Sequence, residues 1–255
     1  MMKAIIEIKG KKIGQGRPLV CIPIMEATEE KILKEAERLE KLEAEMIEWR
    51  VDVFEDCCEP KRVESILEKL KHIIHNSIFI FTFRSHKEGG NCVVSDDILE
   101  QLQLTGAKAD VVDFVDVEFF SVPMIEERIT QIHNYHTFVI TSYHNFESTP
   151  SETELREIFR VMQEKDGDII KVAVMPSQKE DVARLMSETM HFHESHPDTP
   201  LITMSMGREG AISRVLGEFT GSSVTFGAGH IASAPGQIEM GELSGLLDAL
   251  HRNCF

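Results

Sequence analysis

Cationic residues are scarce in this 255-residue sequence, where 27 Lys and Arg stand against 43 Asp and Glu for a formal charge of −16. Because no cationic excess exists to neutralise phosphates, a general nucleic-acid-binding protein is excluded. No apolar run approaches the roughly 18 residues that span a bilayer, and the charged, alternating start 1–9 does not resemble a signal peptide. The composition therefore predicts a soluble, cytoplasmic protein with no membrane partner.

Cysteine is also sparse, at five residues, an odd number that includes the adjacent Cys57 and Cys58 but no C-x-x-C spacing. A reduced, cytosolic protein is a simpler inference from this pattern than a disulfide framework. The dinucleotide fingerprint G-x-G-x-x-G is missing after the early strands. Its absence argues against an open, doubly wound sheet that binds a dinucleotide.

One unit recurs along the chain: an apolar strand, a polar loop and an amphipathic helix. The predicted strands are 18–25, 46–51, 78–83, 111–117, 137–142, 168–174, 201–206 and 223–226. The predicted helices are 28–42, 61–75, 95–106, 123–134, 151–165, 179–193, 208–219 and 241–250. Eight alternating units predict parallel strands that close into an α/β fold, a (β/α)₈ TIM barrel forming one domain over residues 1–255. A short hairpin over residues 4–13 precedes it and is expected to act as a cap.

The strand 168–174 is rich in Ile and Val, which indicates burial on both faces, yet its centre holds Lys171. Burial disfavours the charged form of lysine, and a neutral amine can attack a carbonyl to form a Schiff base. A structural lysine paired with a carboxylate, or one reaching water at a strand end, explains the segment equally well. Residues at the ends of the other strands are needed to distinguish these interpretations.

Polar residues gather at the predicted carboxyl ends of the strands, where the site of such a barrel lies. Glu48 and Arg50 share one face of their strand by the two-residue period. The other candidates are Arg84, Glu88, His144, Arg214, Ser233 and Gln237. Each candidate also has an ordinary structural explanation, such as an ion pair, a hydrogen-bonded histidine, a solvated arginine or a turn. Together with a buried amine, they suit carbonyl chemistry on an anionic polyol.

These segments resemble the type I 3-dehydroquinate dehydratase family, Schiff-base enzymes of the shikimate pathway of aromatic amino-acid biosynthesis. The resemblance covers essentially the whole chain and rests on residues 48–52, 81–85, 88–90, 142–146, 171–176, 202–207 and 233–237. It implies a carbon–oxygen lyase, a hydro-lyase that dehydrates 3-dehydroquinate to 3-dehydroshikimate. It also implies a homodimer, and a site with no metal and no organic cofactor.

The resemblance further implies a role for each candidate. Lys171 would form an imine with the C3 ketone, and His144 would take a proton from C2 and return one to the departing C1 hydroxyl. Glu88 would orient the imidazole. The residues implied to bind the carboxylate are Arg214, Ser233 and Gln237, and those implied to grip the ring hydroxyls and order the site are Glu48, Arg50 and Arg84.

Three alternatives stay open at this point. A class I aldolase would use the same imine to cleave a carbon–carbon bond, although no clear phosphate cradle follows the last two strands. A metal hydrolase built on the histidines of 191–196 is disfavoured, because they fall late in a predicted helix where positions i and i+2 do not face each other. A non-enzymatic binding module of barrel shape leaves the buried lysine without a purpose.

Overall fold

Eight parallel strands form the centre of the protein in the computed structural model, which describes residues 5–230 and 234–254. Their spatial order is β10-β3-β4-β5-β6-β7-β8-β9, and every neighbouring pair is parallel. The bounds are β3 (Leu19–Ile24), β4 (Met46–Arg50), β5 (Ile78–Thr82), β6 (Phe114–Glu118), β7 (Phe138–Asn145), β8 (Ile169–Val174), β9 (Leu201–Ser205) and β10 (Val224–Phe226). A parallel bridge between Leu201 and Ser222 brings the two edges of this order together. The predicted barrel is confirmed.

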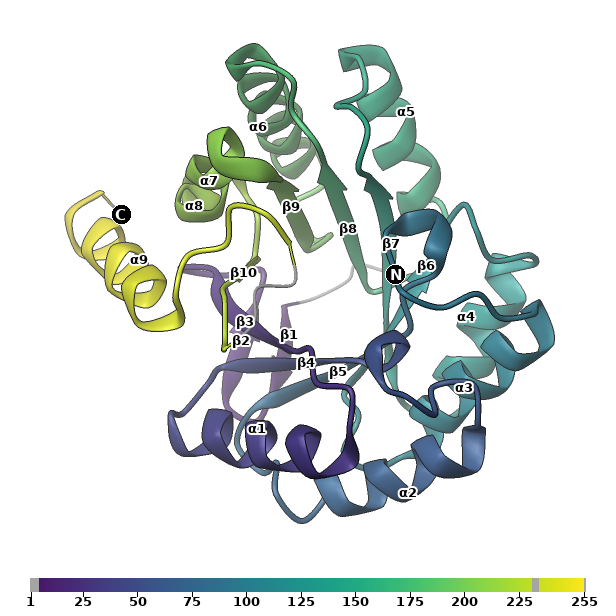
Figure 1. Cartoon of the computed structure of the whole chain (residues 1–255). Coiled ribbons are helices and arrows are strands. Elements are labelled where there is room, and N and C mark those ends of the chain that lie inside the picture. The colour runs from purple at the N-terminus through teal and green to yellow at the C-terminus, as the bar shows by residue number, and fades with distance from the viewer. Residues whose placement is uncertain (1–4, 231–233, 255) are drawn as a thin grey trace.

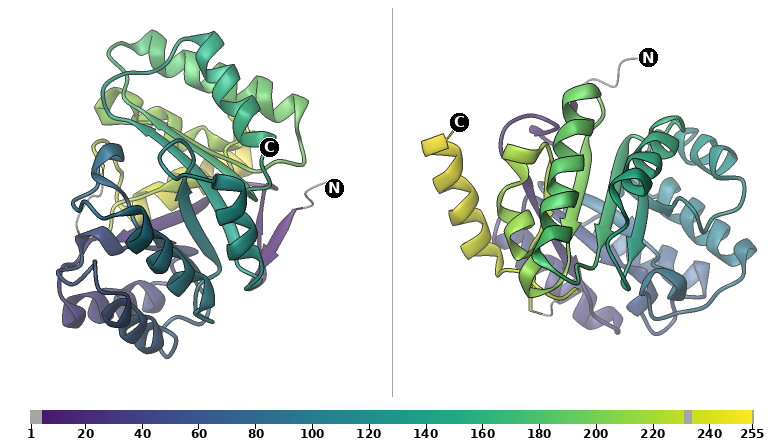
Figure 2. Two further views of the ribbon diagram at one scale, coloured as in Figure 1. Left: turned by 90° about the vertical axis from the view of Figure 1, so that its right-hand side faces the viewer. Right: turned by 90° about the horizontal axis from the view of Figure 1, so that it is seen from above.

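Helices surround the strands, as the three views of Figures 1 and 2 show. Their bounds are α1 (Glu29–Lys41), α2 (Pro60–Leu70), α3 (Asp96–Lys108), α4 (Ile125–His133), α5 (Glu152–Gln163), α6 (Lys179–Ser195), α7 (Gly207–Val215), α8 (Gly217–Thr220) and α9 (Met240–Cys254). Short 3₁₀ turns follow two strands: η1 (Val51–Val53) and η2 (His86–Glu88). At the start of α5, Ser151 and Glu154 form a capping box, which satisfies amide groups that the helix leaves unpaired.

Two predicted helices differ from the observed ones. The helix predicted over 61–75 ends at Leu70, because the Glu40 carboxylate accepts the backbone N–H groups of His75, Asn76 and Ser77 and so turns the chain into β5. The helix predicted over 208–219 is split into α7 and α8. At the break, a Cβ on Gly217 would lie 2.6 Å from Pro18, so the segment can approach the start of β3 only with glycine there.

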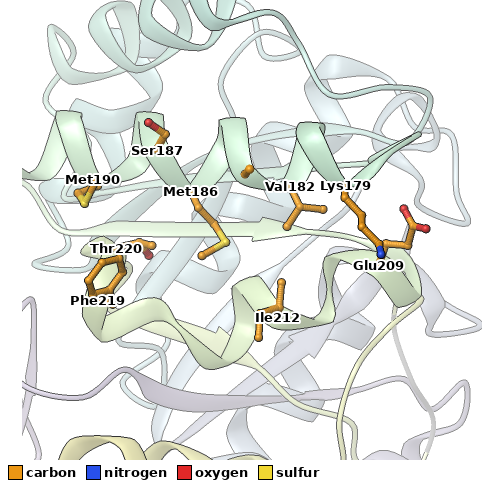
Figure 3. A pocket seen from close by; sticks show the side chains of 10 residues that line it. Lys179, Val182, Met186, Ser187, Met190, Glu209, Ile212, Phe219 and Thr220 are labelled. Carbon is orange, nitrogen blue, oxygen red and sulfur yellow. The ribbon is translucent and has the colours of Figure 1, made fainter. Parts of the chain in front are cut away.

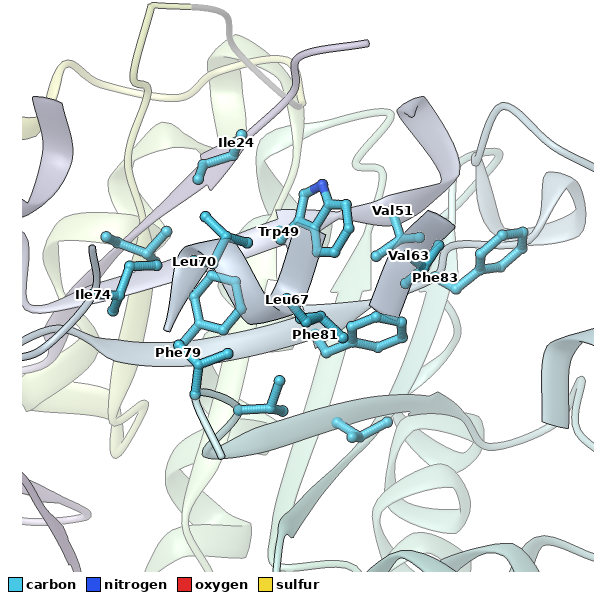
Figure 4. Close-up of a cluster of buried hydrophobic side chains, with 14 of the residues drawn as sticks. Ile24, Trp49, Val51, Val63, Leu67, Leu70, Ile74, Phe79, Phe81 and Phe83 are labelled. Carbon is cyan, nitrogen blue, oxygen red and sulfur yellow. The ribbon is translucent and has the colours of Figure 1, made fainter. Parts of the chain in front are cut away.

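The largest hydrophobic cluster lies between the strands and the outer helices. Figure 4 shows one part of it, where side chains of β4 and β5 meet those of α2. Trp49 and Phe81 are fully buried and their rings meet edge to face, with centroids 6.0 Å apart. Burial on this side explains why alternate strand residues are large and apolar, which leaves the inward-facing positions available for polar groups.

The N-terminal hairpin closes one end of the barrel. Its strands, β1 (Ile6–Ile8) and β2 (Lys11–Ile13), are antiparallel. Ile6 and Ile13 pack in the same cluster as Met46, Ile78 and residues near the starts of the other strands. The expected cap is confirmed, and it leaves the carboxyl ends of the strands as the open mouth. Within the described residues, no helix combines the length and apolar character needed to cross a membrane.

Candidate active site

Lys171 lies inside the barrel on β8 and is 3% exposed. Its ammonium is not isolated: Nζ donates to Glu48 Oε1 at 3.2 Å and to Asp116 Oδ2 at 3.1 Å. The ring of Phe226 lies on another side, with its centroid 4.5 Å from Nζ. A buried cation therefore has two counter-charges, one from β4 and one from β6, and a fixed position.

Arg84, just after the end of β5, shares one of these carboxylates, Asp116, with Lys171. Its guanidinium donates to Asp116 Oδ1 at 2.8 Å, to Glu118 Oε1 at 3.2 Å and to Ser142 Oγ at 2.9 Å. Burial alone would raise the pKa of Asp116, but Arg84 and Lys171 outweigh it and hold that pKa below its usual value. Asp116 is thus an anion shared by two cations, which orients both of them.

His144 and Glu88 form a second buried pair at the barrel mouth. Imidazole Nδ1 lies 2.9 Å from Glu88 Oε2, which also accepts the backbone N–H of His144 at 3.0 Å. Glu88 is placed by η2, and its other oxygen accepts from Ser121 Oγ at 3.1 Å. Ser142 on β7 is the register partner of Lys171 on β8. His144 comes two residues after Ser142, so its side chain lies on the same face of β7.

The two members of this pair are shifted in opposite directions. Burial raises the pKa of Glu88 to about 8, with Arg84 opposing the rise. Burial, together with the cations Arg84, Lys171 and Arg50, lowers the pKa of His144 well below its usual value. Both shifts favour an uncharged imidazole, joined to the carboxyl group by one hydrogen bond between Nδ1 and Oε2. The imidazole is then uncharged and suited to exchange protons.

Arg50, at the end of β4, is held by a bidentate ion pair. Its Nε and Nη2 donate to the two oxygens of Asp52 at 2.8 and 2.9 Å. Asp52 also accepts the backbone N–H groups of Arg84 and Asn91, which ties the β4 loop to the β5 loop. This arrangement fixes the direction of the Arg50 side chain at the pocket.

Arg214, on α7, is 1% exposed and has no carboxylate partner among residues 5–230 and 234–254. Its guanidinium donates to the carbonyl oxygens of Phe226 at 3.1 Å and Pro235 at 3.4 Å, and its Nε has no partner within the same residues. Burial lowers the pKa of Arg214 to about 10. An anion is the ligand that this position suits.

The structure brings most predicted site residues to one pocket at the carboxyl ends of the strands. Its lining includes Glu48, Arg50, Arg84, Glu88, His144, Lys171 and Gln237. Arg214 lies beside it through Phe226 and Met204, which also line the pocket. Ser233 falls outside the residues that the structure describes.

Sequence reasoning assigned no role to Asp116, Glu118, Asp52 and Ser142, although all four hold the charged side chains in place. A signal was present: Asp116 and Glu118 share one face of a buried strand by the two-residue period. Which cations Asp116 and Glu118 contact depends on how the strands are arranged in the barrel, and the sequence does not show this. The histidines of 191–196 lie instead at the end of α6. His196, just past its last residue, stacks on Phe192, and His191 lies 3.5 Å from Glu188.

An α/β barrel with a buried lysine and a histidine–carboxylate pair at its mouth defines a class of barrel enzymes that work on carbonyl compounds. Comparison with protein families matches residues 20–254 to Type I 3-dehydroquinase. The 3-dehydroquinate dehydratase of Bacillus subtilis (strain 168) is 40% identical over 250 residues, which is 98% of each chain. This chain belongs to the type I 3-dehydroquinase family.

Solved structures agree. A type I 3-dehydroquinate dehydratase from Clostridium difficile, solved with covalent modified comenic acid, superposes with a TM-score of 0.94 at 40% identity, covering 98% of this chain and 99% of that one. The enzyme from Geobacillus kaustophilus HTA426 gives 0.94 at 31% identity, with both chains fully covered. The activity is dehydration of 3-dehydroquinate to 3-dehydroshikimate, a hydro-lyase step of the shikimate pathway, and the family works through a Schiff base. This result decides against the aldolase and binding-module alternatives.

The raised pKa of Glu88 predicts a pH-dependent stability. Because the folded carboxyl binds its proton more tightly than the unfolded one, the stability it contributes is complete below about pH 4.5 and is lost as pH rises through about 8. Glu88→Gln should remove this loss. Between about pH 4.5 and about pH 8, the free energy of unfolding of the variant should therefore fall less than that of the wild type. Denaturant titrations at several pH values measure the difference, and Glu147→Gln, at an exposed position, serves as control. Parallel curves for wild type and Glu88→Gln would contradict the assignment.

Proposed function

We propose that Lys171 is the amine that forms the Schiff base and that His144 is the group that moves protons in the dehydration. The observation that carries this proposal is the presence of one buried amine and one histidine–carboxylate pair on adjacent strands of a single pocket. The Clostridium difficile relative, solved with covalent modified comenic acid, supports covalent chemistry in such a site.

The proposed reaction begins when the neutral Lys171 amine attacks the C3 ketone and the ketone oxygen leaves as water. The resulting protonated imine withdraws electrons from C2, and His144 removes a proton there. The electrons move to break the C1–oxygen bond, and the histidine returns a proton to the departing hydroxyl. Hydrolysis of the imine then releases 3-dehydroshikimate and restores the amine.

The carboxylates around Lys171 support this sequence of steps. The positive charge of a protonated imine would occupy the position of the ammonium, between Glu48 and Asp116. The buried charge therefore stays paired throughout, which avoids the large cost of leaving a charge unpaired in the barrel. Glu88 is proposed as a positioning residue, because it contacts the imidazole at Nδ1 and leaves Nε2 free to face the substrate.

Arg214, Ser233 and Gln237 are proposed to bind the substrate carboxylate. The support comes from Arg214, a buried guanidinium without a carboxylate partner in the described part of the chain, for which a substrate anion would supply the counter-charge. Gln237 lines the same pocket. For the ring hydroxyls we propose Glu48 and Arg50. Arg84, whose guanidinium is already shared by Asp116, Glu118 and Ser142, is proposed mainly to order these groups.

Borohydride reduction tests the role of Lys171. With 3-dehydroquinate present, borohydride should inactivate the protein and leave the adduct on Lys171, because only an imine offers a reducible link. Lys171→Met should abolish adduct and turnover. Since Met leaves two carboxylates unpaired, Lys171→Arg, which keeps the charge but forms no imine, provides a second variant with the fold checked by circular dichroism. The exposed Lys34→Met is the control. An adduct on a different lysine would refute the assignment.

Replacing His144 separates proton transfer from imine formation. His144→Ala should slow turnover by about 10²-fold to 10⁴-fold, the usual range for losing a general acid–base group. Imine formation does not need this proton transfer, so substrate should accumulate covalently on Lys171 and be visible by mass spectrometry without borohydride. Glu88→Gln should act in the same direction more weakly. Near-normal turnover of His144→Ala would place the base elsewhere.

Arg214→Lys keeps a positive charge but loses the two-pronged geometry that matches a carboxylate. The variant should raise KM more than it lowers kcat, because the contact is made to substrate and transition state alike. Steady-state kinetics give both constants. The exposed neighbour Arg208→Lys should leave KM unchanged. If Arg214→Lys did so too, the carboxylate would bind at another group.

The homodimer implied by the family resemblance is also proposed here. An apolar groove of about 520 Å³ between α6 and the α7–α8 segment supports it, since Ile212 and Phe219 remain 50% and 59% exposed there (Figure 3). With a net charge of −16 on each chain, two copies should meet at such a mainly apolar surface, whose charged lining residues, Lys179 and Glu209, are opposite in sign. Phe219→Asp should shift the mass in sedimentation to that of one chain. Phe120→Asp, at a 53% exposed position on another face, should not.

A reducing compartment, the cytoplasm, is the proposed location. The odd number of cysteines, with no C-x-x-C spacing, supports it. Because the sulfurs of Cys58 and Cys92 lie 3.3 Å apart, an oxidising compartment would favour a disulfide between them. Fractionation of cells that produce the protein would place it, and recovery with a Cys58–Cys92 disulfide in an oxidising compartment would refute the proposal.

A further inference from the structure

Three thiols meet on the two loops that follow β4 and β5. Cys57 and Cys58 lie between η1 and α2, and Cys92 lies between η2 and α3. The sulfur of Cys58 is 3.3 Å from that of Cys92 and 3.7 Å from that of Cys57, and all three lie within 4.8 Å of one another. The adjacent pair is apparent in the sequence, but its approach to Cys92 comes only from the fold.

We propose that this three-thiol cluster binds one thiophilic divalent metal ion, such as zinc. Zinc–sulfur bonds of about 2.3 Å in a tetrahedron place the sulfurs about 3.8 Å apart, close to the spacing of the cluster. Small adjustments of the side chains would therefore bring all three sulfurs to one ion. Because Cys58 is exposed, the fourth position faces solvent and is open to water.

The number of sulfurs favours an ion over the alternatives. A disulfide needs two thiols and leaves the third without a role, whereas a metal ion uses all three. Cys57 is 5% exposed and belongs to the edge of the hydrophobic core, yet its sulfur is directed at Cys58. Cysteine ligates metal ions as the thiolate, so ion binding must displace protons and should strengthen as pH rises.

The position of the cluster gives the ion a structural function. Cys92 pairs with Ser85 through a parallel bridge, and its neighbour Asn91 donates to Asp52, the partner of Arg50. The segment between Ser85 and Cys92 also carries Glu88. An ion bound to all three thiols would thus join the loop after β4 to the loop after β5. It would stabilise the positions of both loops without taking part in the dehydration.

Metal titration of the reduced, full-length protein without an affinity tag tests the proposal. After removal of metal and equilibration with zinc, the wild type should retain about one ion per chain and unfold at a higher temperature than the metal-free form. Cys58→Ser and Cys92→Ser should each lose the ion and the temperature shift. Cys254→Ser, which changes an exposed cysteine of α9, should keep both. Circular dichroism confirms that each variant is folded.

Cobalt(II) in place of zinc identifies the ligands. Thiolate ligation should produce intense sulfur-to-cobalt absorption in the near ultraviolet, which Cys58→Ser weakens and Cys254→Ser leaves unchanged. Weak ion binding that survives the cysteine substitutions would come from surface histidines such as His191 and would overturn the proposal. A reduced protein that retains no ion, but forms a Cys58–Cys92 disulfide on treatment with peroxide, would also overturn it.

Discussion

The buried ion network around Lys171 is the constraint on which the rest of the site depends. Lys171 and Arg84 share Asp116, and Glu48 supplies a second counter-charge to the lysine. Removing one member of such a network leaves another charge unpaired in the barrel, at a cost of about 3–5 kcal/mol. The network therefore fixes the Lys171 amine in one place, between two carboxylates.

The barrel creates this network by bringing side chains from four of its strands together in its interior. Glu48 comes from β4, Arg84 follows β5, Asp116 comes from β6 and Lys171 from β8. Alternate side chains of each strand point outward and pack against the helices. The side chains between them therefore point into the barrel interior. Because the N-terminal hairpin closes the opposite end, these inward groups can meet solvent and substrate only at the mouth.

Two further kinds of ionisable group lie near the Lys171 amine. In the His144–Glu88 pair, burial raises the pKa of the carboxyl group and lowers that of the imidazole, which favours an uncharged imidazole. Arg214, by contrast, has a permanent charge and no carboxylate partner in the described residues. The two kinds of group lie on separate elements: His144 of β7 lines the pocket, and Arg214 of α7 lies beside it.

The sequence by itself determined the architecture, because strand and helix periodicity are local properties that alternate through eight units. It also marked Lys171 as a polar residue in an apolar strand, and the motifs at the strand ends pointed to the family. It did not determine the end of α2, the break between α7 and α8, or the role of Asp116. Those depend on contacts between residues far apart in the chain, such as Glu40 with Ser77 and Gly217 with Pro18, and such contacts exist only once the barrel has closed.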